Sequence, residues 1–114
     1  MSELPTITRD DLRAKIDAGD DFVLVDALAP MSYARSHLPG AVNLPLDWVD
    51  ERARLRIPGL GTVVVVYCVD RECDSSVQVG ERLRQLGYTN VLHYAEGKKD
   101  WVEAGLPLEG GGVS

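Results

Sequence analysis

The sequence predicts an α/β domain in which a mainly parallel sheet is covered by helices on both faces. Segments with the pattern of strands alternate along the chain with segments that have the spacing and boundary residues of helices. The run from Thr62 to Val66 is β-branched, apolar and too short to cross a membrane, which is typical of a strand buried on both faces of a parallel sheet. This alternation predicts three layers joined by right-handed crossovers.

The size and composition are those of one globular domain. The chain has 114 residues, of which 45% are hydrophobic and 26% charged, so it can bury a core without disulfides or metal ions as supports. We expect residues 1–114 to form a single domain. Its core should extend from about residue 6 to residue 108, followed by a flexible glycine-rich tail over 109–114.

The charge of the chain argues against several classes of partner. Twelve basic and eighteen acidic residues give a net charge of −6, which disfavours nucleic acids and anionic membrane surfaces. The amino terminus has neither the basic nor the apolar region of a secretory signal, and no segment is long enough to span a bilayer. We therefore expect a cytoplasmic protein whose two cysteines are reactive or buried. No cysteine and histidine cluster has the spacing of a zinc site.

Local boundary signals define the elements of the first half of the chain. Thr8-Arg-Asp-Asp11 has the form of a capping box, and Leu12 and Ile16 follow at helical spacing up to Gly19. Phe22 to Asp26 reads as a buried strand. The other expected elements are a short helix over 30–36, a short strand over 41–44 and a partly helical stretch over 47–56.

The second half repeats the alternation after the central run. Asp74, Ser75 and Ser76 are all suitable N-cap residues for a helix that Gly87 ends. The remaining expected elements are a strand over 90–94 and a helix over 98–104.

Cys68 follows the central strand directly and is the first candidate for chemistry. Open α/β sheets bind ligands at the carboxyl ends of their strands, beside helix N-termini that favour anions. A thiol there can have a pKa below its usual value of about 8.5 and act as a nucleophilic thiolate. The alternative is that Cys68 is a small buried hydrophobic residue at a strand end.

Two further polar residues have a structural and a chemical interpretation. Asp26 ends the first strand and could be an acid or a ligand, although its type more often forms a turn by accepting hydrogen bonds from nearby backbone N–H groups. His37 could be a general base, although a histidine beside a Pro-Gly turn more often makes local hydrogen bonds. We expect structural support from both.

Several motifs, in this order, resemble those of the rhodanese domain family. The most specific is His37-Leu-Pro-Gly-Ala-Val-Asn-Leu-Pro45, which follows Leu24-Val-Asp-Ala-Leu-Ala-Pro-Met-Ser-Tyr33. Val64-Val-Val-Tyr-Cys68 and Leu83-Arg-Gln-Leu-Gly-Tyr88 come next. The last are Gly97 with Trp101, and Ala104-Gly-Leu-Pro107. The resemblance covers about residues 6–108 and implies a three-layer rhodanese-like fold.

The resemblance implies a sulfurtransferase that needs neither a metal nor an organic cofactor. In that family the cysteine after the central strand accepts a sulfane sulfur as a persulfide and passes it to a nucleophile, and Cys68 falls on that position. The implied partners are a small sulfur donor and a thiol acceptor, which could be a protein thiol or a thioredoxin-like reductant. The loop would surround the sulfur with backbone N–H groups. Its residues are Val69, Asp70, Arg71, Glu72, Asp74, Ser75 and Ser76.

The loop departs from the family pattern in length and charge. Family loops often end in an arginine five residues after the cysteine, followed by a serine, whereas alignment from Leu83-Arg-Gln-Leu-Gly-Tyr88 places that pair on Ser75 and Ser76. The loop is therefore two residues longer. Its one cation, Arg71, stands among three carboxylates, and Leu28 replaces a frequent arginine. The expected enzyme is a thiosulfate- or thiol-dependent sulfurtransferase. This loop disfavours ordinary thiosulfate to cyanide transfer, and it disfavours phosphatase or arsenate reductase activity more strongly.

Cys73 is a second thiol in the same loop. It could attack a persulfide on Cys68, release sulfide and leave a disulfide for a reductant to reopen, or it could be an incidental loop residue. A bridge requires Cα atoms about 4.4 to 6.8 Å apart.

Two other functions stay open: a non-catalytic binding or regulatory module of the same fold, and a dithiol redox protein without sulfur transfer.

Overall fold

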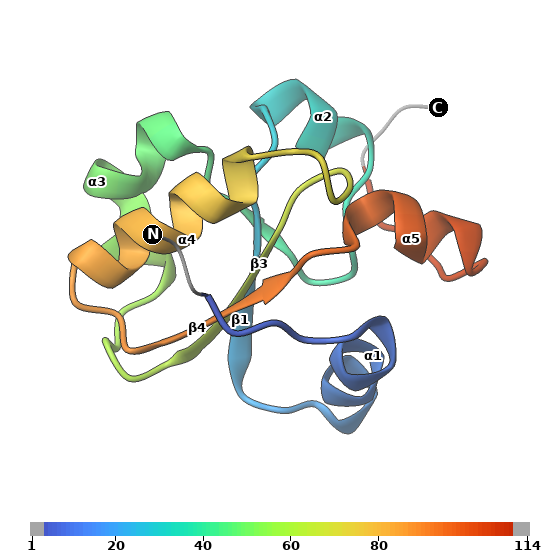
Figure 1. The fold of residues 1–114 in the computed structure, drawn as a ribbon, viewed down its shortest axis with the longest axis horizontal. Helices are drawn as coiled ribbons and strands as arrows, with labels where there is room; N and C mark the ends of the chain where they lie inside the picture. Colours follow the sequence, from blue (N-terminus) through green and yellow to red (C-terminus); the bar gives the residue numbers. More distant parts are fainter. Residues whose placement is uncertain (1–3, 111–114) are drawn as a thin grey trace.

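The computed structural model describes residues 4–110 and has nine helices and strands in that range. Figure 1 shows how they are arranged. Strands and helices alternate along the chain, as the sequence predicts. In chain order the elements are α1 (Arg9–Ala18), β1 (Phe22–Asp26), α2 (Pro30–Arg35), β2 (Val42–Asn43), α3 (Leu46–Arg56), β3 (Val63–Tyr67), α4 (Ser75–Gln85), β4 (Asn90–Tyr94) and α5 (Gly97–Glu103). Within the described part of the chain, no helix is long and apolar enough to cross a membrane.

The four strands form one parallel sheet in the order β2-β1-β3-β4. The apolar strand β3 lies between β1 and β4, with Val65 in register with Leu24 on one side and Leu92 on the other. All four carboxyl ends therefore meet at one edge of the sheet, and Cys68 follows β3 at that edge.

Helices cover both faces of the sheet, which confirms the predicted α/β architecture (Figure 1). Because strand side chains alternate between faces, Val64 and Val66 pack in a cluster with residues of α3 and α4. Val65 and Tyr67 pack in the other cluster, which contains Leu12 of α1 and Trp101 of α5. Both faces of β3 are thus buried, as its uniformly apolar sequence predicts.

Local sequence signals predict the ends of the first helix correctly but predict too long a second strand. The Thr8 hydroxyl accepts a hydrogen bond from the Asp11 N–H at 3.1 Å, and Gly19 ends α1 in the left-handed conformation with φ 67°. In contrast, β2 has two residues, where the sequence predicts a strand over 41–44. The Ala41 N–H donates to Leu38 in a turn, and Pro45 already flanks α3, so neither end of the predicted range extends the strand.

The structure describes two residues of the predicted tail, Glu109 and Gly110. Glu109, which the sequence places in a flexible tail, pairs with His37 through reciprocal backbone hydrogen bonds of 2.7 and 2.8 Å. This pairing fastens the end of the chain to the turn that follows α2. The rest of the predicted tail, from residue 111 onward, lies outside the described residues.

Candidate functional site

Cys68 lies immediately beyond β3, where its side chain is buried, and it is joined to Cys73 by a disulfide. The two Cα atoms are 6.2 Å apart, within the usual range for a bridge. Cys73 is partly exposed. The bond closes the segment between β3 and α4 into a ring, so the two thiols that the sequence places in one loop are in direct contact.

The loop that the disulfide closes contains a turn built on Asp70. The Asp70 carboxylate accepts a hydrogen bond from the Glu72 N–H at 3.0 Å, and its carbonyl oxygen accepts one from the Cys73 N–H at 3.3 Å. This is the local bonding that favours aspartate in turns. Two of the loop N–H groups expected to surround the sulfur are therefore used within the loop in this disulfide form.

The first turn of α5 holds the other end of the loop. The N–H groups of Lys98 and Lys99 donate to the carbonyl oxygens of Cys68 and Val69 at 2.9 and 2.8 Å. Gly97 makes this approach feasible, because it has φ +76° and a Cβ atom there would lie 2.6 Å from the Val69 carbonyl oxygen. The backbone of Cys68 is thus fixed from the side of α5.

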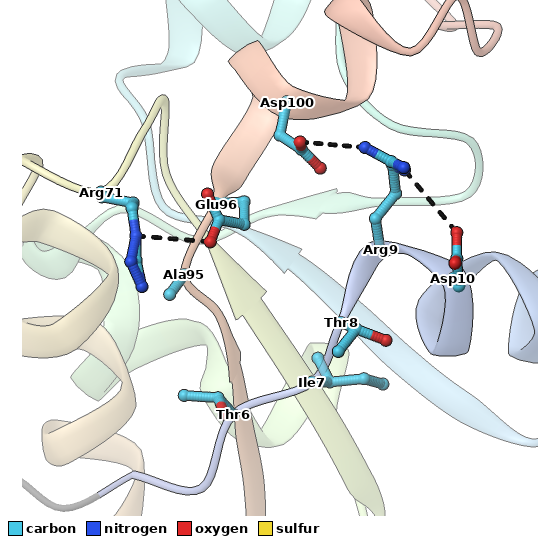
Figure 2. Close-up of a pocket in the computed structure, with 9 residues that line it drawn as sticks. All are labelled: Thr6, Ile7, Thr8, Arg9, Asp10, Arg71, Ala95, Glu96 and Asp100. Atoms are coloured by element: carbon cyan, nitrogen blue, oxygen red, sulfur yellow. Dashed lines mark hydrogen bonds and ion pairs between the residues drawn. The ribbon is translucent and has the colours of Figure 1, made fainter.

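The one cation of the loop turns away from the loop carboxylates. Arg71 pairs with Glu96 at 3.3 Å, and both side chains are largely exposed. Figure 2 shows this pair on one side of a pocket of about 380 Å³, with a 3.0 Å ion pair between Arg9 and Asp100 on another side. The Arg71 charge is therefore partly neutralised by Glu96, the N-cap residue of α5, and the loop also carries three carboxylates. They belong to Asp70, Glu72 and Asp74.

A buried hydrogen-bonded group lies beneath the loop. Asp26 is fully buried, and its carboxylate accepts hydrogen bonds from the Leu28 N–H at 2.8 Å and from the Tyr67 hydroxyl at 2.7 Å. The Tyr67 oxygen in turn accepts one from the Leu38 N–H at 3.0 Å. Burial raises the pKa of Asp26, against the opposing effect of these hydrogen bonds, and burial also raises the pKa of Tyr67. These contacts join the ends of β1 and β3.

His37 makes local contacts with α2 and the end of the chain. Its ring stacks on Tyr33 with centroids 3.9 Å apart, and its Nδ1 lies 2.8 Å from the Tyr33 carbonyl oxygen. Its Nε2 is 3.8 Å from the Glu109 carboxylate. These contacts fit the structural interpretation of His37 that the Pro-Gly turn suggests.

The start of α4 contains a contact that the sequence reasoning missed. Asp74 holds the N-cap position without a side-chain capping bond, and Ser75 begins the helix. The buried Ser76 hydroxyl lies 2.8 Å from Nε2 of His93 in β4. Burial lowers the pKa of His93, which favours its neutral form. The available signal was strand alternation, which places His93 on the same face of β4 as Val91, toward α4.

Comparison with known proteins gives a consistent result. A family model described as the rhodanese-like domain matches residues 8–104. The chain is 38% identical over 76 residues to the thiosulfate sulfurtransferase PspE of Escherichia coli, covering 67% of this chain and 70% of that protein. It is 32% identical over 102 residues to a sulfurtransferase of Allochromatium vinosum, covering 90% and 92%.

The similarity extends to solved structures and to longer proteins. A human single-domain sulfurtransferase superposes with a TM-score of 0.76 at 26% identity, covering 89% of this chain and 97% of that one. Other curated relatives are longer, and the chain spans 52% of one from Bacillus subtilis and 47% of one from Synechocystis.

Proposed function

Because the chain belongs to the rhodanese-like domain family, we propose that it is a sulfurtransferase in which Cys68 carries sulfane sulfur as a persulfide and Cys73 resolves it. Relatives named as sulfurtransferases support the reaction class. The observation that carries the proposed mechanism is the direct bond between Cys68 and Cys73 within one loop.

The first step is attack of the Cys68 thiolate on the outer sulfur of a donor. A new sulfur–sulfur bond forms on Cys68, the sulfur–sulfur bond of the donor breaks, and the donor leaves as a thiolate or as sulfite. The N–H groups at the start of α4 favour the negative charge on the persulfide. The loop N–H groups that are not used by Asp70 act in the same way.

The second step is attack of the Cys73 thiolate on the Cys68 sulfur. The persulfide bond breaks, its outer sulfur takes a proton from water and leaves as hydrosulfide, and the two cysteines become the disulfide seen here. The sulfane sulfur is reduced to sulfide and the two thiols are oxidised. An external dithiol, such as a thioredoxin-like reductant, then restores both thiols and is itself oxidised to a disulfide.

The charge of the loop selects among donors. The loop that follows Cys68 carries three carboxylates, and its one cation, Arg71, pairs with Glu96. Like charges repel a dianion such as thiosulfate more strongly than a singly charged persulfide. We therefore propose a low-molecular-weight or protein persulfide as the preferred donor.

A dithiol redox protein without sulfur transfer is the second candidate, because the same disulfide requires no persulfide. Hydrosulfide release from a low-molecular-weight persulfide, measured with a thioredoxin-type reductant and a protein-free blank, separates the two. The sulfurtransferase predicts steady release that is absent in Cys68→Ser and about tenfold slower in Cys73→Ser. Release at the blank rate by the wild type, while its disulfide still cycles, contradicts sulfur transfer and supports the redox protein.

A further inference from the structure

A second pocket, of about 340 Å³, lies between α2, the end of β2 and α3. In Figure 1, α3 lies at the upper left of the fold and α2 at the top. The pocket combines aromatic rings with cationic groups and has no carboxylate in its lining. Its chemically distinctive residues are Tyr33, Asn43, Trp48, Arg52 and Arg56. The pocket lining is therefore positively charged, although the chain as a whole has a net charge of −6.

Successive turns of α3 bring Trp48, Arg52 and Arg56 to the pocket, because residues four apart lie on one face of a helix. The guanidinium carbon of Arg52 lies 3.9 Å from the centre of the Trp48 ring. Such stacking fixes the plane of a guanidinium and leaves the N–H groups on its edge available for an oxyanion.

Neither pocket arginine has its charge neutralised by a carboxylate among residues 4–110. Arg82 of α4 is different, because it makes two hydrogen bonds to the Asp50 carboxylate, at 2.7 and 3.0 Å. Arg52 and Arg56 therefore keep their capacity for charge-assisted hydrogen bonds to a ligand.

The opposite wall of the pocket is fixed by its own hydrogen bonds. The Tyr33 hydroxyl donates to the Ala41 carbonyl oxygen at 2.6 Å. The Asn43 amide donates to the carbonyl oxygens of Asp26 and Leu28 at 3.1 and 2.9 Å. Both walls are thus in place without a ligand, which reduces the entropic cost of binding.

We propose that this pocket binds a small organic oxyanion, in which a carboxylate or phosphate group contacts Arg52 and Arg56 and an apolar or planar body contacts the aromatic wall. The volume falls in the range of about 300–1,000 Å³ for small-molecule sites. The site is separate from the cysteine pair, and its existence does not depend on sulfur transfer.

The test follows the indole N–H signals of the two tryptophans by NMR during titration with phenyl phosphate and, in parallel, benzoate. The Trp48 signal should shift saturably, whereas that of Trp101, which is buried and donates to Pro107 at 2.8 Å, should stay in place. Inorganic phosphate and phenol, which each carry half of the proposed ligand, should bind at least about tenfold more weakly than phenyl phosphate. Whether phenyl phosphate or benzoate binds more tightly identifies the anionic group.

Arg52→Gln and Arg56→Gln should each weaken phenyl phosphate binding about tenfold, because each removes a charge-assisted hydrogen bond. Arg54→Gln is the matched control, since it removes the same charge from the same helix but its residue does not line the pocket. Equal weakening in Arg54→Gln would show attraction to a generally basic helix and overturn the proposal. Unsaturable Trp48 shifts, or phenol binding as tight as phenyl phosphate binding, would overturn it as well.

Discussion

The peptide bond between Tyr67 and Cys68 separates two regions of opposite character. On the sheet side, Tyr67 and Asp26 are fully buried and hydrogen-bonded to each other and to the backbone. On the loop side, most residues from Val69 to Asp74 are charged or exposed, and the segment is held by the disulfide, the Asp70 turn and the contact with α5. The change from a buried core to an exposed loop takes two residues, since Cys68 is still buried and Val69 is exposed.

The difference between the two regions indicates that separate groups control the position of Cys68 and its reactivity. Buried polar groups are costly to disturb, because a group left unpaired bears the full free-energy cost of its removal from water. The sheet side therefore fixes where Cys68 lies. Exposed loop charges contribute little to stability, so they can change which small molecules approach Cys68 without unfolding the domain.

Tyr67→Phe should have the largest effect on stability. It leaves the Leu38 N–H and Oδ2 of Asp26 each without their hydrogen-bond partner in the core, while Oδ1 of Asp26 still accepts from the Leu28 N–H. We expect the free energy of unfolding to fall by about 2–4 kcal/mol. Urea unfolding of the oxidised protein measures the change. Tyr88→Phe is the control, because that buried hydroxyl makes a single hydrogen bond, to the Ile57 carbonyl at 2.6 Å. An equal loss in both variants would contradict a special role for the region beneath Cys68.

Neutralising the loop carboxylates should change reactivity and leave stability almost unaltered. In a triple variant with Asp70→Asn, Glu72→Gln and Asp74→Asn, the reaction of the reduced protein with thiosulfate should accelerate about tenfold at low salt, with a smaller gain at high salt. Asparagine at residue 70 retains the oxygen that accepts the Glu72 N–H. The free energy of unfolding should change by less than about 0.5 kcal/mol.

A second triple variant controls for net charge. It removes three exposed carboxylates outside the loop, by Asp17→Asn, Asp21→Asn and Glu51→Gln. The rate with thiosulfate should then stay within about twofold of wild type at moderate salt, because charges beyond a Debye length are screened. Equal acceleration by both triple variants would mean that overall charge, and not the loop, controls the reaction.

The dependence of stability on pH gives the finest test of the buried group. Burial raises the pKa of Asp26 above its ordinary value of 3.8, so the folded chain binds more protons than the unfolded chain between the two values. The free energy of unfolding should therefore fall as pH rises through that window, by the contribution of this residue. Asp26→Asn should show a flatter profile there than the wild type. Parallel profiles would mean that Asp26 has the same pKa in both states.

Local patterns predicted the sheet, the helices and the place of Cys68. The run before Cys68 is long and apolar enough to define a buried strand, and Thr8 and Gly19 define a helix by bonds within a few residues. The resemblance to rhodaneses extended this reading to a reaction class, which the family match supports.

Contacts between residues far apart in the chain could not be predicted from the sequence. Arg71 turns to Glu96 because β4 and α5 bring that carboxylate beside the loop, and Ser76 meets His93 across the gap between α4 and β4. The pairing of Glu109 with His37 joins segments 72 positions apart. Each contact depends on how the elements pack, which neither spacing nor composition specifies.

The most direct test of the central claim is the intact mass of the reduced protein after brief exposure to a low-molecular-weight persulfide and, separately, to thiosulfate. Wild type, Cys68→Ser and Cys73→Ser are compared under the same conditions. We predict a gain of one sulfur atom from the persulfide, absent in Cys68→Ser and longer-lived in Cys73→Ser than in the wild type. The contradicting result is that Cys73→Ser gains no sulfur from either donor and that its Cys68 is alkylated only slowly below a pH of about 8.5. That result would exclude sulfur transfer and favour a binding module of the same fold.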